Sequence, residues 1–218
     1  MEKWKSPPHQ LQLKGCVTKK FGYDTRGIVD YQFNSQGFRS PEITNQPTIF
    51  FVGNSISFGI GLDESHTFVA LTANTLNFPY VNLSYGCYKH ENHDHLDNVK
   101  NISLRNQDDI IVVQINNLDR RRRGDLVLDG NHPEFCKNKF LDYFEKVNSL
   151  LKNKTKIFLY WDNVVYDLPK SVTDQIFVYN RGHLDQSLSN YPDTFGIKTH
   201  NFISKVLCQH LQNQLDQK

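Results

Sequence analysis

Short apolar runs alternate with amphipathic segments from residue 48 to the end of this 218-residue chain. Runs rich in β-branched and aromatic residues predict buried strands at 48–53, 80–85, 109–115, 156–161 and 175–180. Apolar residues at helical spacing predict helices at 63–76, 93–104, 133–152 and 196–215. Strands that alternate with helices indicate an α/β fold, in which a parallel sheet is covered by helices on both faces.

The apolar stripes of two helices predict the faces that pack against the sheet. In 133–152 the stripe consists of Phe140, Phe144, Val147 and Leu151. In the closing helix, 196–215, we expect the buried face to contain Phe202, Val206 and Leu207. Residues 1–47 are polar and turn-rich, so we predict an N-terminal arm packed on a single domain formed by residues 48–218.

Composition narrows the possible environments and partners. Apolar residues make up 38% of the chain and charged residues 22%, which is enough for a buried core, and the net charge of +2 gives no strong attraction to nucleic acid or membranes. No window of about 18 apolar residues predicts a membrane span, and the first residues lack a signal-peptide pattern, so a cytoplasmic location is expected. The cysteines are widely spaced without a CxxC pair, and free thiols are expected.

Polar and small residues follow the predicted strands, where parallel sheets bind ligands. The positions are Gly53-Asn54-Ser55, Gly86-Cys87, Asn116-Asn117, Asp162-Asn163 and the loop 181–196. A serine hydroxyl can attack a carbonyl when a base takes its proton. A glycine N–H and an asparagine amide can stabilise the resulting oxyanion. The strand ends therefore favour acyl transfer, although Ser55 at a strand end is also typical of a helix cap.

The stretch from residue 34 to 120 resembles the SGNH (GDSL-type) hydrolases. Gly53-Asn54-Ser55 is similar to their Gly-Asp-Ser block, and "FGIGLDESHTF" (58–68) resembles the segment that trails the nucleophilic serine. "NSQGFRSPE" (34–42) is similar to a motif found upstream in many members. Gly86 in "YVNLSYGC" matches the second block, and Asn116 in "QINNL" matches the asparagine of the third, with Asn117 in place of an aspartate.

The last block of the family departs from its usual form in this chain. The family has Asp-x-x-His before the closing helix, but "SLSNYPDTFGIKTHNF" (187–202) has Tyr191 where the histidine should be. His200 is then the first candidate for the base, with Asp193 as its orienting carboxylate. Many members carry a second, non-catalytic histidine near the position of His200. His183 is the alternative base, and the absence of a catalytic dyad is a further alternative.

Together, the alternation and the resemblance imply a three-layer α/β/α sandwich with a five-stranded parallel sheet, similar in architecture to flavodoxin. The resemblance implies a serine esterase that acts on an O-acyl or O-acetyl ester of a sugar or another small polar molecule. Ser55 would be the nucleophile, the Ser55 and Gly86 N–H groups and the Asn116 amide would bind the oxyanion, and no cofactor or metal would be needed. An O-acyltransferase and a non-catalytic binding protein are the alternatives.

Two charged segments suggest other functions. "HENHDH" (90–95) contains histidines, but its spacing is not the H-E-x-x-H of zinc enzymes, and a solvated segment at the rim of the pocket is expected. Arg120–Arg123 would suit a phosphate, a nucleic acid or an acidic sugar, or would form a solvated basic loop, which is the main expectation. We expect a small-molecule or glycan ester as the partner, and neither nucleic acid nor a membrane. The oligomeric state is not predicted.

Overall fold

The computed structural model of the chain describes residues 31–85, 95–115, 133–161, 169–173, 176–179 and 196–216. Within these ranges the side chains of 133–136, 161, 173 and 176–179 are not described. The strands are β1 (Ile49–Val52), β2 (Tyr80–Asn82), β3 (Ile110–Ile115), β4 (Thr155–Trp161) and β5 (Ile176–Tyr179). The helices are α2 (Ser55–Phe58), α3 (Phe68–Leu76), α4 (Leu96–Ser103), α5 (Pro133–Leu150), α6 (Lys170–Thr173) and α7 (Ile197–Leu215), with a 3₁₀ turn η2 (Glu64–His66).

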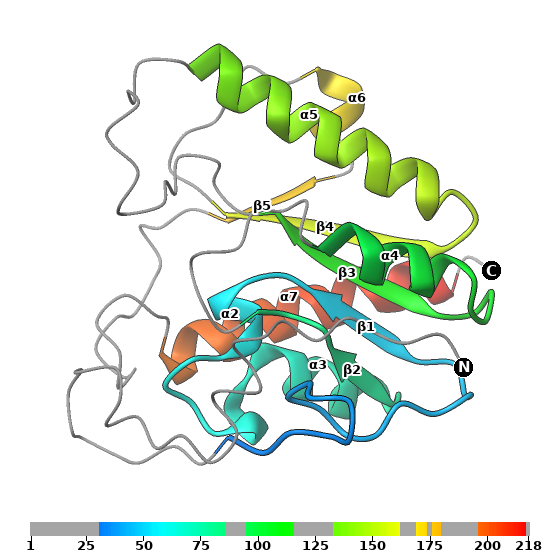
Figure 1. Ribbon diagram of the computed structural model, residues 1–218. Coiled ribbons are helices and arrows are strands. Elements are labelled where there is room, and N and C mark those ends of the chain that lie inside the picture. Colours follow the sequence, from blue (N-terminus) through cyan, green and yellow to red (C-terminus); the bar gives the residue numbers. More distant parts are fainter. Residues whose placement is uncertain are drawn as a thin grey trace.

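The strands form one parallel sheet in the order β2-β1-β3-β4-β5. Helices α3 and α7 cover one face of the sheet, and α4 and α5 cover the other (Figure 1). The predicted α/β fold with a covered parallel sheet is therefore confirmed. In such a sheet all strands end at the same edge, so the carboxyl ends of the neighbouring strands β2, β1 and β3 lie together.

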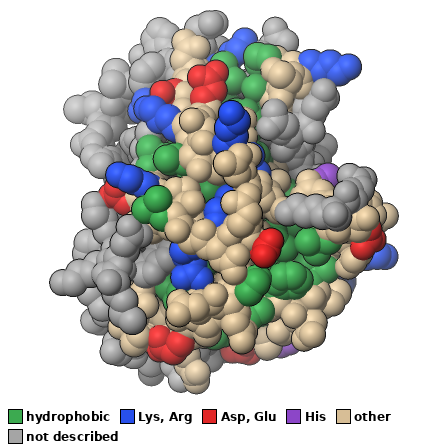
Figure 2. Space-filling model, turned by 90° about the vertical axis from the view of Figure 1, so that its right-hand side faces the viewer, with side chains coloured by type: hydrophobic (Ala, Val, Ile, Leu, Met, Phe, Trp, Pro, Cys, Tyr) green, Lys and Arg blue, Asp and Glu red, His purple; other side chains and the backbone are tan. Residues whose placement is uncertain are grey.

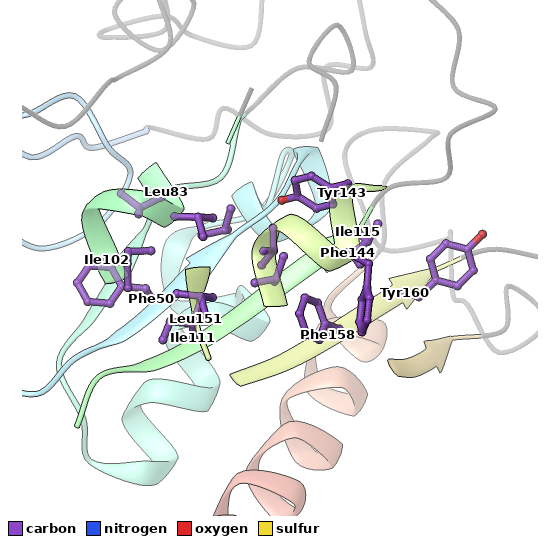
Figure 3. Packing of buried hydrophobic residues seen from close by; sticks show 14 of the residues in the cluster. Phe50, Leu83, Ile102, Ile111, Ile115, Tyr143, Phe144, Leu151, Phe158 and Tyr160 are labelled. Atoms are coloured by element: carbon purple, nitrogen blue, oxygen red, sulfur yellow. The ribbon is translucent and has the colours of Figure 1, made fainter. Parts of the chain in front are cut away.

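Each face of the sheet buries its own apolar cluster. Beneath α4 and α5, aromatic and branched side chains interlock, as Figure 3 shows for Phe50, Tyr143, Phe144 and Phe158 among others. The stripe predicted for α5 is confirmed, since its members Phe140, Phe144, Val147 and Leu151 are all buried. The cluster beneath α3 and α7 includes Phe51, Phe68, Val112, Ile203 and Leu207.

The face predicted for the closing helix is partly wrong. Phe202 is 49% exposed and Val206 is only half-buried, whereas Leu207 is buried as expected. The buried side of α7 consists of Thr199, His200, Ile203, Ser204, Leu207 and Leu211. Two of its polar members have partners on α3: the Thr72 hydroxyl donates to Ser204 Oγ at 3.2 Å, and His200 Nδ1 accepts a hydrogen bond from the Phe68 N–H.

The described part of the N-terminal arm, residues 31–47, packs its apolar side chains into the domain. Phe38 is fully buried in the cluster beneath α4 and α5, and Tyr31 packs on Phe58.

None of the described helices is long and apolar enough to cross a membrane. Figure 2 shows one face of the molecule, on which basic and acidic side chains are interspersed. Cys208, the one cysteine whose side chain is described, is a free thiol.

Candidate active site

Ser55 lies at the carboxyl end of β1 as the first residue of the short helix α2. The cap of this helix is Asn54, whose Oδ1 accepts a hydrogen bond from the Ile56 N–H at 3.2 Å. The Ser55 carbonyl accepts from the N–H groups of Gly59 and Ile60, each at 3.1 Å. The Ser55 hydroxyl makes no hydrogen bond to any residue that the structure describes. Asn54 rather than Ser55 therefore caps this helix, and the Ser55 hydroxyl has no hydrogen-bonding role among the described residues.

Side-chain amides from neighbouring strands hold α2 in place. Gln114 of β3 accepts from both the N–H, at 3.1 Å, and the hydroxyl of Ser57, and its Nε2 donates to Asn54 Oδ1 at 2.9 Å. Asn82 of β2 donates from Nδ2 to the Ser57 carbonyl at 2.8 Å. The hydroxyl of Ser57 thus serves the fold, in contrast to that of Ser55. Sequence reasoning missed Asn82 and Gln114, whose signal is a side-chain amide inside each apolar strand run.

The same network explains why asparagine can stand where the family has aspartate. Asn54 Oδ1 accepts both the Ile56 N–H and the Gln114 amide, and one side-chain oxygen is sufficient for these two bonds. Asparagine and aspartate are both preferred helix caps. The turn that presents Ser55 therefore does not require a carboxylate charge.

The absence of a side chain at Gly53 allows the backbone after β1 to lie close to Ser57 and Gln114. A Cβ at position 53 would lie 2.7 Å from Ser57 Oγ and 2.8 Å from both Cβ and Oε1 of Gln114. The Gly53 carbonyl also accepts from the Tyr85 N–H at 2.9 Å, which ties the segment after β2 to the end of β1. The position therefore has no room for a side chain.

We expect Gly53→Ala to destabilise the protein and to impair Ser55. The new methyl group would push against Gln114 Cβ, which is fixed by the backbone of β3, at a cost of about 2 kcal/mol typical of overpacking. The urea midpoint should fall, and the rate of any Ser55-dependent reaction should fall by roughly 10²-fold through misplacement of α2. An unchanged midpoint together with full activity would show that the packing at position 53 is loose.

The predicted oxyanion donors follow strands that end beside Ser55. Beyond β2, the Leu83 N–H donates to the Phe51 carbonyl at 2.8 Å, so this segment runs alongside β1 as far as Tyr85, the residue before Gly86. β3 ends at Ile115, the residue before Asn116. Several predicted site residues lie outside the described residues: Gly86, Asn116, His183, Asp193 and the Arg120–Arg123 run.

The histidine-rich segment "HENHDH" is described only at His95, which precedes α4 and stacks on Tyr85. Among the described residues, no group of acidic residues, histidines and cysteines is arranged to hold a metal ion.

His200 is described, and it makes a structural contact. Its ring is 1% exposed, and its Nδ1 accepts the Phe68 N–H at the start of α3 at 2.8 Å. Burial, followed by the charge of Arg39, lowers the pKa of His200 to about 3. A neutral imidazole that accepts at Nδ1 carries its proton on Nε2, so it has no second lone pair for a serine proton. This geometry favours the alternative in which His200 is like the second, non-catalytic histidine that many SGNH hydrolases carry near this position.

The buried state of His200 predicts a pH-dependent stability. The pKa is about 3 in the folded chain against an ordinary value of 6.5, so below pH 6.5 the unfolded chain binds a proton that the folded chain does not. Stability from this group is therefore full above pH 6.5 and is lost as the pH falls. Between pH 6.5 and 4.5 we expect a loss of roughly 2–3 kcal/mol. His200→Asn keeps an acceptor for the Phe68 N–H but does not titrate. In urea unfolding the wild type should lose more stability than this variant over that range, and parallel curves would contradict the assignment.

Comparisons with known proteins show the fold. No protein-family model and no curated protein matches the chain. A carbohydrate esterase family 2 enzyme of Corynascus thermopiles (Myceliophthora fergusii) with a carbohydrate binding domain is 13% identical, with a TM-score of 0.52 over 81% of this chain and 69% of that one. An acetyl xylan esterase of the rumen bacterium Butyrivibrio proteoclasticus is 16% identical, with a TM-score of 0.53 over 80% of this chain and 65% of that one.

A third solved structure is a carbohydrate esterase whose active site displays divergent catalytic and non-catalytic binding functions. It is 14% identical and has a TM-score of 0.53 over 79% of this chain and 66% of that one. The chain thus spans about two thirds of the length of these esterases. At such identities the likeness shows the fold alone, and that fold is the one implied by the resemblance to the SGNH hydrolases.

Proposed function

We propose that this protein is a serine esterase of the SGNH type that hydrolyses an O-acyl ester, with an O-acetyl group on a sugar or another small polar molecule as the substrate. The observation that carries the proposal is the state of Ser55. Its hydroxyl stands at the carboxyl end of β1 without a hydrogen bond to any described residue, while Asn54 caps the helix and Ser57 joins the strand network.

In the proposed reaction, Ser55 Oγ attacks the acyl carbonyl and a histidine takes the hydroxyl proton. The N–H groups of Ser55 and Gly86 and the side-chain amide of Asn116 stabilise the oxyanion of the tetrahedral intermediate. The intermediate collapses when the histidine protonates the leaving alcohol. A water molecule then releases the acyl group by the same steps. If the hydroxyl of a second molecule enters instead of water, the same groups perform acyl transfer.

We propose His183 as the base, because the lone pair of His200 Nδ1 already accepts the Phe68 N–H. His200 then has the non-catalytic role, in which it joins α7 to the start of α3. We propose that Asp193, which the sequence paired with His200, is the carboxylate that orients His183. A buried or paired carboxylate in this role would hold the imidazole in one tautomer and stabilise the imidazolium as it forms.

The substrate class follows from two supports. The fold is shared with enzymes described as carbohydrate esterases, among them an acetyl xylan esterase. An acyl group of small size also suits a nucleophile that is only 6% exposed. We propose no cofactor, because the serine mechanism needs none. The cytoplasmic location expected from the sequence is part of this proposal.

Covalent labelling tests the proposal directly. An active-site organophosphonate probe should modify the wild-type protein at one serine, and peptide mapping should place the adduct on the fragment that contains Ser55. The substrate would then be identified by incubating the protein with a panel of O-acetylated mono- and oligosaccharides and measuring the acetate released from each. Labelling at Ser57 instead of Ser55, or the absence of any adduct together with no acetate release, would contradict the proposal.

A binding protein without activity is the second candidate. The observation that favours it is the departure of the last block, where Tyr191 takes the place of the histidine. One esterase of the same fold has an active site with non-catalytic binding functions. This candidate predicts no labelling of Ser55 and measurable binding of an oligosaccharide by calorimetry, with no acetate release from the bound ligand.

A further inference from the structure

We infer that Arg39 is a positioning residue for the nucleophile: its buried guanidinium holds the loop Phe58–Leu62 in the conformation that fixes Ser55. The inference rests on the proposed function for its catalytic consequence. The structural part of the inference, that Arg39 holds the loop Phe58–Leu62 in one conformation, does not depend on the proposed function. Arg39 belongs to the "NSQGFRSPE" segment, for which the proposed reaction gives no role.

The Arg39 guanidinium donates hydrogen bonds to three backbone carbonyl groups of the loop. Arg39 Nη1 donates to the carbonyls of Phe58 at 2.8 Å and Gly59 at 2.7 Å, and Nη2 donates to that of Leu62 at 2.5 Å. The side chain is 1% exposed, so water does not compete for these bonds. A planar fork with several fixed donors suits three carbonyls that point in different directions, whereas an ammonium group would be a single point of contact.

The same loop holds Ser55 through its N–H groups. Gly59 and Ile60 each donate to the Ser55 carbonyl at 3.1 Å, while the Gly59 carbonyl is held by Arg39. Gly59 adopts a left-handed conformation with φ 75°, and a Cβ there would lie 2.3 Å from Thr67 Cγ2. The loop is therefore tightly confined, and hydrogen bonds link the guanidinium, through Gly59, to the backbone carbonyl of Ser55.

A buried cation without a carboxylate in direct contact is costly to the fold. Among the described residues, no carboxylate lies within ion-pair distance of Arg39. Its charge is met by carbonyl dipoles, by the rings of Tyr31 and Phe58, whose centroids lie 4.6 and 5.4 Å from the guanidinium carbon, and by the more distant carboxylates of Glu64 and Asp63. An apolar side chain would avoid the desolvation of a charge, which costs several kcal/mol. This cost favours a role for Arg39 in orienting the loop over a role in stability alone.

The preceding turn is built to deliver this side chain. Asn34 Oδ1 accepts from the N–H groups of Gln36 and Phe38, both at 3.0 Å, and Gly37 has φ 84°. The hydroxyl and N–H of Ser35 both donate to the Glu42 carboxylate at 2.7 Å, which closes the segment. The turn anchors Phe38 in the core and thereby directs the next residue, Arg39, toward the loop after α2.

The experiment compares Arg39→Met, Arg39→Lys and the milder Tyr31→Phe with the wild type. Tyr31 Oη accepts the Gly61 N–H at 2.8 Å, so its loss frees one bond of the same loop. The matched control is Arg105→Met. Arg105 also bonds a carbonyl, that of Thr44 at 2.7 Å, and lies over a ring, but it precedes β3 at the opposite edge of the sheet. The readouts are the rate of organophosphonate labelling of Ser55, hydrogen exchange of the peptide 55–62, and the thermal midpoint.

We expect labelling to slow by roughly 10²-fold in Arg39→Met, because a small displacement of a nucleophile has effects of this size. Arg39→Lys should recover part of the rate, and Tyr31→Phe should slow it about fivefold, as for the loss of one hydrogen bond. Exchange of 55–62 should accelerate in these variants, while peptides of α5 should not change. In Arg105→Met the thermal midpoint should fall while labelling stays near the wild-type rate.

Equal labelling rates in folded Arg39→Met and the wild type would overturn the inference. So would a loss in Arg39→Met no larger than the loss in Arg105→Met, since general destabilisation would then explain both. If Arg39→Met does not fold, Tyr31→Phe and Arg39→Lys decide by the same criteria. If the wild type itself is not labelled, the proposed function fails. Unchanged exchange of peptide 55–62 would then overturn the positioning role separately.

Discussion

Replacing Ser55 by alanine is expected to lower kcat/KM for p-nitrophenyl acetate by about 10⁴-fold or more, the scale typical of a lost nucleophile. The change removes only the hydroxyl oxygen, which makes no hydrogen bond to any described residue. The cap from Asn54 and the bonds to the Ser55 carbonyl involve other atoms and should persist. The thermal midpoint of Ser55→Ala should therefore stay near that of the wild type while the hydrolysis rate approaches the background.

Ser204→Ala is the matched control for this experiment. Ser204 is 5% exposed, close to the 6% of Ser55, but it lies on α7 and bonds Thr72 and Cys208. Its loss should lower stability by about 1 kcal/mol and leave kcat/KM within a few-fold of the wild-type value. If Ser55→Ala retained wild-type activity, the chemistry would lie elsewhere. If the wild type were no more active than Ser55→Ala on acetylated sugars as well, the binding-only candidate would gain.

Much of the sheet could be predicted from the sequence because its signals are local. In 109–115 nearly every side chain is apolar and many are β-branched, and the strand β3 occupies Ile110–Ile115. The position of Ser55 also followed from a local pattern, small residues directly after a buried run. The helix α5 was predictable because its apolar stripe repeats over several turns.

The support of the candidate site could not be predicted, because it depends on contacts between distant residues. Gln114 acts on Ser57, 57 residues earlier, and Asn82 reaches the same turn from another strand. The orientation of α7 failed for the same reason. Phe202 is more apolar than His200, but His200 gains a backbone partner 132 residues away and is buried in its place. Pattern analysis weighs side chains by polarity and has no information on such partners.

The two histidines should respond in opposite ways to replacement by asparagine. We expect His183→Asn to lower kcat/KM by about 10³–10⁴-fold, because general-base catalysis and nucleophile activation are lost together. His200→Asn should remain within a few-fold of the wild type, since its side-chain oxygen can accept the Phe68 N–H as Nδ1 does. Hydrolysis of p-nitrophenyl acetate at pH 7.5, with both variants at equal concentration and checked for folding, measures the contrast.

The pH profile separates this interpretation from its rival. If His183 is the base, kcat/KM of His200→Asn should keep the wild-type inflection near neutral pH, since the titrating group is intact. If His200 were the base, this variant would lose both the activity and the inflection, and its imidazole would have to leave the Phe68 N–H during the reaction. If the His200 imidazole left the Phe68 N–H, it would also leave the buried site in which its pKa is lowered to about 3. A group with that pKa binds a proton too weakly at neutral pH to serve as a base without such a rearrangement, and this is the physical ground for placing the base at His183.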